Sequence, residues 1–268
     1  MAYEDIIFTK EDGVATITLN RPKTLNALTW PLLIEMQDAI DKVAVDDEVR
    51  VLVITGAGRA FCAGDNLKDK GTHVSVMDGR EDSFQEQKRV LESLRNLRKP
   101  VIAAVNGNSH GAGSDIMLAC DMRIASSEAK LGDLRTRRGI PIATGSTHLL
   151  PALVGLSNAI DLLFTGKMID AAEAERIGLV NQTVPAEAFE AEVKKLARTL
   201  AEGPTKIIGM AKVEIYRELY MTLGQAIDDE LAEMGPAPER NAYRNMIEDN
   251  REGTTSFIEK RAPKFTGK

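Results

Sequence analysis

Hydrophobic positions along this chain follow two different periods, which alternate through its first two thirds. Ala15, Ile17 and Leu19 alternate with Thr16 and Thr18, a pattern that predicts a half-buried strand. Further strands are predicted at 49–55 and 101–105, where the chain is apolar and rich in β-branched residues, and at 122–126 and 179–184. The chain therefore begins with several strands that are spaced widely enough to hold helices between them.

Helical spacing appears between these strands. One predicted helix has a single apolar side, formed by Leu32, Met36, Ile40 and Val43. Thr29, just before Pro31, is a start signal for this helix. A second helix is predicted over 83–97. Alternation of strands and helices predicts α/β architecture, although periodicity alone does not separate a doubly wound sheet from a stacked spiral.

From about residue 186 the pattern becomes helical only. One amphipathic helix is marked by Phe189, Val193, Leu196 and Leu200, and another by Leu223, Ile227 and Leu231. The apolar side of such a helix requires burial, either on the core of the same chain or on another subunit. We therefore expect a C-terminal helical region that takes part in assembly.

Composition narrows the class of protein. The 268 residues are 43% hydrophobic and 28% charged, values typical of a soluble globular chain. A net charge of −6 argues against a nucleic-acid partner. We find no apolar run of membrane-spanning length and no signal peptide at the N-terminus, so a cytoplasmic protein without a membrane partner is expected. Cys62 and Cys120 form neither a disulfide framework nor a metal-binding pattern.

Two glycine-rich turns carry the candidate chemistry. One is Gly111-Ala-Gly-Ser-Asp115, which follows the apolar run 101–105 and precedes a predicted buried helix. The other is Phe61-Cys-Ala-Gly-Asp65, which follows the run 49–55. Such turns leave backbone N–H groups free at a helix start, where they can hold an oxygen that becomes negative during a reaction. Asp115 lies one turn into the helix. It is close enough to exchange a proton with the part of the substrate that the bound carbonyl group activates.

These residues resemble a known family. The motifs that carry the resemblance are Asn20-Arg-Pro-Lys-Thr-Leu-Asn-Ala-Leu28, Phe61-Cys-Ala-Gly-Asp65, Lys99-Pro-Val-Ile-Ala-Ala-Val-Asn-Gly107, His110-Gly-Ala-Gly-Ser-Asp115, Ala119-Cys-Asp-Met-Arg-Ile-Ala125 and Phe257-Ile-Glu-Lys-Arg261. Together they resemble the crotonase (enoyl-CoA hydratase/isomerase) superfamily. The resemblance implies a spiral of repeated ββα units over 1–195 that carries an acyl-CoA site. It also implies a helical region over 196–268 that builds homotrimers or homohexamers.

The resemblance also implies roles for individual residues. The backbone N–H groups of Asp65 and Ala112 would form the oxyanion hole that polarises a thioester carbonyl. The residues implied to bind coenzyme A are Lys23, Asn26, Ala27, Leu28, Ala63, Phe257 and Lys260. No cofactor is implied other than the coenzyme A carried by the substrate. The polar segment 66–83 is interpreted as a loop that could cover the acyl pocket.

At the two acidic positions this chain departs from the family. Family hydratases have glutamates where this chain has Asp115 and Arg135, so these two are the catalytic candidates. Arg135 cannot act as a base, because it stays protonated, but it would lower the pKa of an adjacent Asp115. Three interpretations stay open: Asp115 transfers protons alone, Arg135 binds a polar tail of the acyl group, or the two form a structural ion pair. Replacement acids to consider are Asp133, His110, His73, Glu81 and Glu86.

The expected function is therefore that of an acyl-CoA-processing enzyme that stabilises a thioester enolate or oxyanion. Water addition to a 2-enoyl-CoA is the first hypothesis. An enoyl-CoA isomerase or an acyl-CoA hydrolase with Asp115 as the sole acid/base is the second. The third is a non-catalytic acyl-CoA-binding subunit, which the retention of both glycine turns disfavours.

Overall fold

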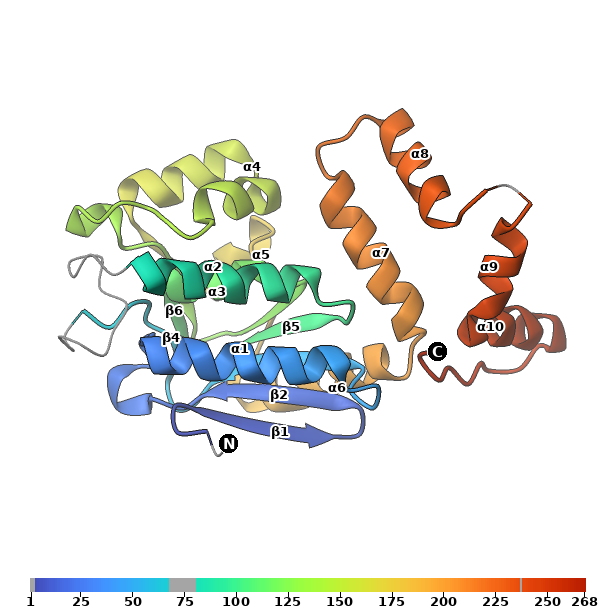
Figure 1. The fold of residues 1–268 in the computed structure, drawn as a ribbon. Coiled ribbons are helices and arrows are strands. Elements are labelled where there is room, and N and C mark those ends of the chain that lie inside the picture. The colour runs from blue at the N-terminus through green and yellow to red at the C-terminus, as the bar shows by residue number, and fades with distance from the viewer. Residues whose placement is uncertain (1–2, 68–80, 237) are drawn as a thin grey trace.

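The computed structural model describes residues 3–67, 81–236 and 238–268 of the chain. Its strands form two sheets (Figure 1). The larger sheet has the order β1-β2-β3-β5-β7-β10, with bounds Ile6–Glu11, Val14–Leu19, Val51–Gly56, Val101–Val105, Met122–Ser126 and Gln182–Val184. The smaller has the order β4-β6-β8-β9, with bounds Ala60–Cys62, Asn108–His110, Lys130–Gly132 and Met168–Asp170. The β1–β2 and β8–β9 pairs are antiparallel and the others are parallel.

One step repeats along the chain and builds both sheets. The pairs β3/β4, β5/β6 and β7/β8 each contribute one strand to each sheet, and a helix follows each pair. The helices of the body are α1 (Trp30–Val45), α2 (Glu81–Asn96), α3 (Ala112–Ala119), α4 (Ser146–Thr165), α5 (Ala171–Arg176) and α6 (Phe189–Ala201). Short 3₁₀ turns lie at Pro22–Thr24, Thr136–Arg138 and Ala186–Ala188. This is the spiral of ββα units that the sequence resemblance implied.

Helices cover the larger sheet on both faces. The main core lies between one face and helices α1 to α4, with Phe61, Leu32 and Leu94 fully buried in it. On the other face, Phe189 and Val193 of α6 pack against Val53 of β3 and its neighbours. Thr29 caps α1, because its side chain accepts a hydrogen bond from the N–H of Leu32, so the predicted helix start is confirmed.

After α6 the chain leaves the body as a helical arm (Figure 1). Its helices are α7 (Thr205–Glu218), α8 (Leu223–Glu233), α9 (Arg240–Met246) and α10 (Glu248–Glu259). The boundary expected after residue 195 falls inside α6, which packs on the larger sheet. None of the residues of α8, which is described in full, is buried, and Leu223 is 77% exposed. The apolar side predicted for this helix is thus uncovered within one chain.

Two other expectations need correction. Most of the predicted loop 66–83 lies outside the described residues, and α2 already begins at Glu81. Among the described residues, α4 is long and apolar enough on average to cross a membrane, although we expected no such segment. Its Leu150 and Val154 belong to the main core, and Gly155 interrupts its helical geometry with φ of 75°. The packing of one side of α4 on the body favours a core helix.

Candidate active site

The two glycine-rich turns predicted from the sequence lie against each other. Gly64 follows β4 with φ of 82°, a conformation that favours glycine. A Cβ atom at this position would lie 2.8 Å from the carbonyl oxygen of His110 and 3.3 Å from the nitrogen of Ala112. The close approach therefore requires glycine, and it brings the β4 turn next to the start of α3.

Backbone N–H groups are left open where the turns meet. The N–H of Leu28 donates to the carbonyl of Gly64 (2.8 Å), and the N–H of Asn66 donates to the carbonyl of Leu28 (3.0 Å). Leu28 and Asp65 thus form a parallel β-bridge through the residues on either side of Asp65. The N–H of Asp65 itself therefore points away from Leu28. Ala112 is the first residue of α3, so its N–H has no partner within the helix. Neither N–H donates to a backbone carbonyl of the described residues. The structure thus brings together the two N–H groups predicted to form an oxyanion hole.

The early loop predicted to contact coenzyme A lies beside these turns. The side-chain amide of Asn26 donates to the carbonyls of Ala57 (2.9 Å) and Ala60 (2.8 Å), and the residue is fully buried. Ala27 and Leu28 are buried as well, whereas Lys23 is exposed and Ala63 is half-buried. Asn26 therefore holds the loop in place, and of this set Lys23 offers the accessible cation.

Phe257 and Lys260 are not brought to this loop within one chain. Phe257 lies in α10, and Lys260 is the residue directly after this helix. Helix α10 lies at the end of the arm that is far from β4, β6 and α3 (Figure 1). The side chain of Phe257 is 85% exposed.

Asp115 and Arg135 form a buried ion pair. Asp115 belongs to α3 and is 1% exposed, and Arg135, which precedes a 3₁₀ turn, is 7% exposed. Nη1 of Arg135 donates to Oδ2 of Asp115 at 3.0 Å, and Nη2 donates to Oδ1 at 3.1 Å. Thr144 and Ser146 also donate their hydroxyls to this carboxylate. Four donors thus occupy the acceptor sites of Asp115.

Asp133 completes the surroundings of the guanidinium. Nε of Arg135 donates to Oδ1 of Asp133 at 3.0 Å, Nη2 donates to Oδ2 at 2.5 Å, and Nη1 also donates to the carbonyl of Ala143 at 2.7 Å. Burial lowers the pKa of Arg135, but its hydrogen bonds and charge interactions with the two aspartates raise it overall. Protein groups thus accept hydrogen bonds from all the N–H groups of Arg135. This favours the interpretation of Asp115 and Arg135 as a structural ion pair over the interpretation in which Arg135 binds a polar tail of the acyl group.

Burial has a larger effect on Asp115 than its cationic neighbour has. It raises the pKa of this carboxyl to about 6, while the charge of Arg135 and the hydrogen bonds from Ser146, Thr144 and Arg135 act to lower it. The expected effect of Arg135 on this pKa is thus confirmed in direction, but burial outweighs it. The sequence pattern gave no measure of how deeply Asp115 and Arg135 are buried, so it could not predict the net change in pKa.

The sequence did not identify the side chain of Asp65, which was assigned only a backbone role. This carboxyl is half-buried, and Nε2 of Gln87 in α2 donates to its Oδ1 at 2.8 Å. Its Oδ2 accepts no hydrogen bond from any described residue. Burial raises the pKa of Asp65 to about 6, with a further rise from the charge of Asp115 and opposing effects from Gln87 and Arg135. A second titratable carboxyl thus lies at the turn itself.

The remaining candidate acids are less well placed. His110 ends β6 and is half-buried, and burial lowers its pKa. Glu86 lies in α2 and has an ion-pair distance of 3.9 Å to Arg89. The side chain of Glu81 and the whole of His73 lie outside the described residues. Among the described residues, no group of three or more His, Cys, Asp or Glu side chains is arranged to hold a metal ion.

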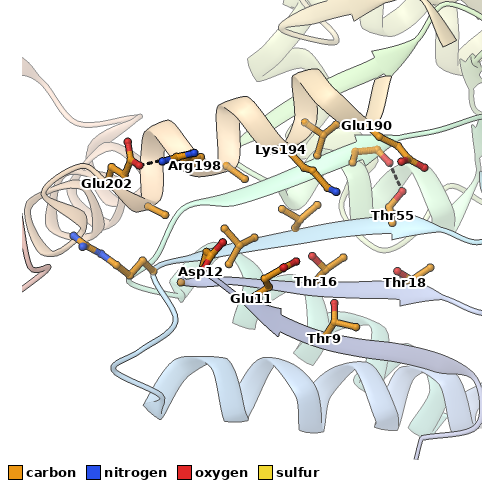
Figure 2. Close-up of a pocket in the computed structure, with 18 of the residues that line it drawn as sticks. Thr9, Glu11, Asp12, Thr16, Thr18, Thr55, Glu190, Lys194, Arg198 and Glu202 are labelled. Atoms are coloured by element: carbon orange, nitrogen blue, oxygen red, sulfur yellow. Dashed lines mark hydrogen bonds and ion pairs between the residues drawn. The ribbon is translucent and has the colours of Figure 1, made fainter. Parts of the chain in front are cut away.

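A separate groove lies on the opposite face of the larger sheet. It has a volume of 1470 Å³ and lies between α6 and strands β1 to β3. Figure 2 shows Thr9, Thr16 and Thr18 on strands that face the helix carrying Lys194 and Arg198. Its lining mixes apolar side chains with polar side chains and charges of both signs. The glycine turns lie on the other side of the sheet.

Comparison with known proteins finds similar sequences and structures over nearly the whole chain. A family model described as enoyl-CoA hydratase/isomerase matches residues 9–268. The chain is 38% identical to a crotonyl-CoA hydratase of Syntrophomonas wolfei, over all of both chains. It is 36% identical to a short-chain-enoyl-CoA hydratase of Clostridium acetobutylicum, over 97% of each. A solved enoyl-CoA hydratase from Bacillus anthracis superimposes with a TM-score of 0.90 at 31% identity, covering 99% of this chain and all of that one.

Proposed function

Because this chain belongs to the enoyl-CoA hydratase/isomerase family, we propose that it is an enzyme that adds water across the double bond of a 2-enoyl-CoA thioester. The acyl-CoA is the substrate, and the reaction requires no further cofactor. The names of the two relatives above support hydration. The observation that carries the proposal is the pair of open N–H groups at Asp65 and Ala112.

Two N–H donors are suited to the oxygen of a thioester. When water adds to the β-carbon, electrons of the double bond move to the carbonyl oxygen, and an enolate forms. Fixed donors stabilise this charge without having to reorganise, and removing one such donor from an enzyme typically slows the reaction by about 10²–10³-fold. The start of α3 adds the positive end of the helix dipole at Ala112.

Asp115 and Arg135 act as one positioning unit in this proposal. With four donors on its carboxylate, Asp115 is held in place at the beginning of α3. The ion pair ties the segment around Arg135 to the helix whose first N–H binds the oxygen. Buried pairs of this kind are weak evidence for stability but hold geometry when all their hydrogen bonds are made.

A second reaction is favoured by one observation. Family hydratases place a glutamate where Arg135 stands here, and this side chain cannot hold and activate a water as a base would. Isomerisation or thioester hydrolysis through the same oxyanion therefore stays in competition with hydration. A non-catalytic acyl-CoA-binding subunit is disfavoured, because the glycine turn at Gly64 is kept together with both open N–H groups.

Binding of coenzyme A is proposed to involve more than one copy. Lys23 lies in the loop beside the turns, whereas Lys260 lies on the arm of the same chain and far from them. A homotrimer or homohexamer would place the arm of one copy over the turns of the next and cover the exposed side of α8. The proposal describes a soluble, cytoplasmic assembly that uses neither nucleic acid nor membrane.

Mass spectrometry of a panel of CoA thioesters tests the proposed function. Incubation with a short-chain 2-enoyl-CoA should give a product heavier by one water. A product of unchanged mass with altered retention would show isomerisation, and free coenzyme A would show hydrolysis. If every thioester of the panel is bound but remains unchanged, the assignment as an enzyme is refuted.

A further inference from the structure

We infer that the side chain of Asp65 is the proton-transfer group of this site, acting on the acyl chain whose carbonyl oxygen is bound by the N–H of the same residue. The inference rests on the proposed function and deepens it, because the sequence and the family resemblance gave Asp65 only a backbone role.

The first argument is availability. Arg135, Thr144 and Ser146 saturate the carboxylate of Asp115, which would have to break several hydrogen bonds before it could accept a proton. Asp133 is likewise held by Arg135. In Asp65, by contrast, one oxygen accepts a bond from Gln87 and the other accepts none from the described residues. Of these three aspartates, only Asp65 keeps an oxygen free.

The second argument is position. In our proposal Asp65 supplies one of the two N–H groups that bind the thioester oxygen, so its carboxyl belongs to the same residue that binds the atom that becomes negative. Gln87, buried in α2, fixes the side chain from one side. The α- and β-carbons of an enoyl thioester lie two and three bonds from the carbonyl oxygen. A carboxyl held beside that oxygen is therefore within reach of the atoms that gain and lose protons.

The third argument is proton affinity. Burial raises the pKa of Asp65 to about 6. A carboxyl of ordinary pKa is a weak base, and catalytic groups work best when the pKa lies near the working pH. The charged and titratable groups that act on Asp65 are Asp115 of α3 and Arg135, beside the neutral Gln87 of α2. At pH 7 Asp65 is thus largely ionised and more basic than a solvent-exposed aspartate.

The proposed step balances with water as the only co-reactant. The carboxylate of Asp65 takes one proton from a water as the water oxygen bonds to the β-carbon. The electrons of the double bond move to the thioester oxygen, which the two N–H groups hold as an enolate. The enolate then takes the same proton from Asp65 at the α-carbon, which restores the carboxylate and completes the addition of one water.

Steady-state kinetics of Asp65→Asn test this role against a merely structural one. Asparagine keeps the backbone N–H and can still accept the hydrogen bond from Gln87. We expect kcat to fall by about 10²–10⁴-fold, with little change in the affinity for the CoA thioester by calorimetry. Asp65→Glu should restore part of kcat. Asp161→Asn, a change to a surface carboxylate of α4 that is half exposed, is the matched control and should leave kcat unchanged.

The pH profile distinguishes Asp65 from its neighbours. Wild-type kcat should fall below about pH 6, and the residual activity of Asp65→Asn should lose this acidic limb. If Asp115 or His110 were the base, the limb would survive in Asp65→Asn. Hydration by the wild type together with full activity in Asp65→Asn would overturn the inference and leave the proposed function intact. A wild type that turns over no CoA thioester would overturn the proposed function itself.

Discussion

Replacing Asp65 with asparagine should stabilise the protein at neutral pH while it removes activity. The pKa of this carboxyl rises from an ordinary 3.8 to about 6 in the folded chain, because burial penalises the ionised form. A rise of two units corresponds to about 3 kcal/mol of unfolding free energy. Since the side chain is only half-buried, solvent screens part of this, and we expect a gain of about 1–2 kcal/mol for Asp65→Asn at pH 7.5.

The sign follows from proton linkage. A carboxyl with a raised folded pKa binds more protons in the folded chain than in the unfolded chain between pH 4 and pH 6. Its favourable contribution is complete below about pH 4 and is lost as the pH rises through 6. The stability difference between Asp65→Asn and wild type should therefore be near zero at pH 4, grow through this window and stay constant above it.

Urea unfolding of both proteins at several pH values measures this difference. Protein concentration must be equal in all samples, because assembly adds to apparent stability. Comparing the two proteins at each pH cancels most of the contribution of Asp115, which titrates in the same range. A variant less stable than wild type at pH 7.5, or a difference that does not change between pH 4 and pH 7.5, would refute the reasoning.

Three further outcomes are expected. Arg135→Glu would place a third carboxylate between Asp115 and Asp133, and loss of a buried ion pair costs about 3–5 kcal/mol. The melting temperature in thermal unfolding should therefore fall severely, and a value equal to that of the wild type would contradict the buried cluster. Lys260→Ala should weaken binding of all CoA thioesters by about fivefold in calorimetric titration, and an effect limited to one acyl group would contradict a coenzyme A contact. Light scattering should give three or six times the chain mass of 29.2 kDa, and a monomer at micromolar concentration would refute assembly through the arm.

The sequence predicted the long and uniformly apolar elements well. Strands 101–105 and 122–126 have the predicted bounds. The first is buried throughout and reads as a continuous apolar run, whereas the second also contains Arg123 and Ser126. The strands of the smaller sheet could not be recovered in the same way. Each has three residues, too few to show a period, and β6 reads Asn108-Ser-His110. Such short strands form because the larger sheet and the helices position them.

The sequence predicted two features of the candidate site: the close approach of the backbone at the glycine turns, and the opposite charges of Asp115 and Arg135. Glycine at positions 64 and 111 indicated close backbone approach, and the structure brings these turns together. An ion pair of Asp115 with Arg135 was one of three interpretations open from the sequence. The contributions of Thr144 and Ser146 were not recognisable, because segments 11 to 31 residues apart meet there only through the fold. Depth of burial, which sets the sign of the pKa change, is also a property of the whole fold.

The balance of charge around Arg135 explains why Asp65 is the reactive carboxyl in our proposal. One guanidinium compensates Asp115 and Asp133, both of which it contacts directly. Asp65 makes no hydrogen bond to Arg135, and among the described residues its one side-chain donor is the neutral amide of Gln87. A partly buried carboxyl without a cationic hydrogen-bond partner retains its proton to higher pH and is a stronger base once ionised. Replacement of a glutamate by Arg135 would thus remove one base from the site and hold two aspartates in place, leaving the acid/base role to the uncompensated third.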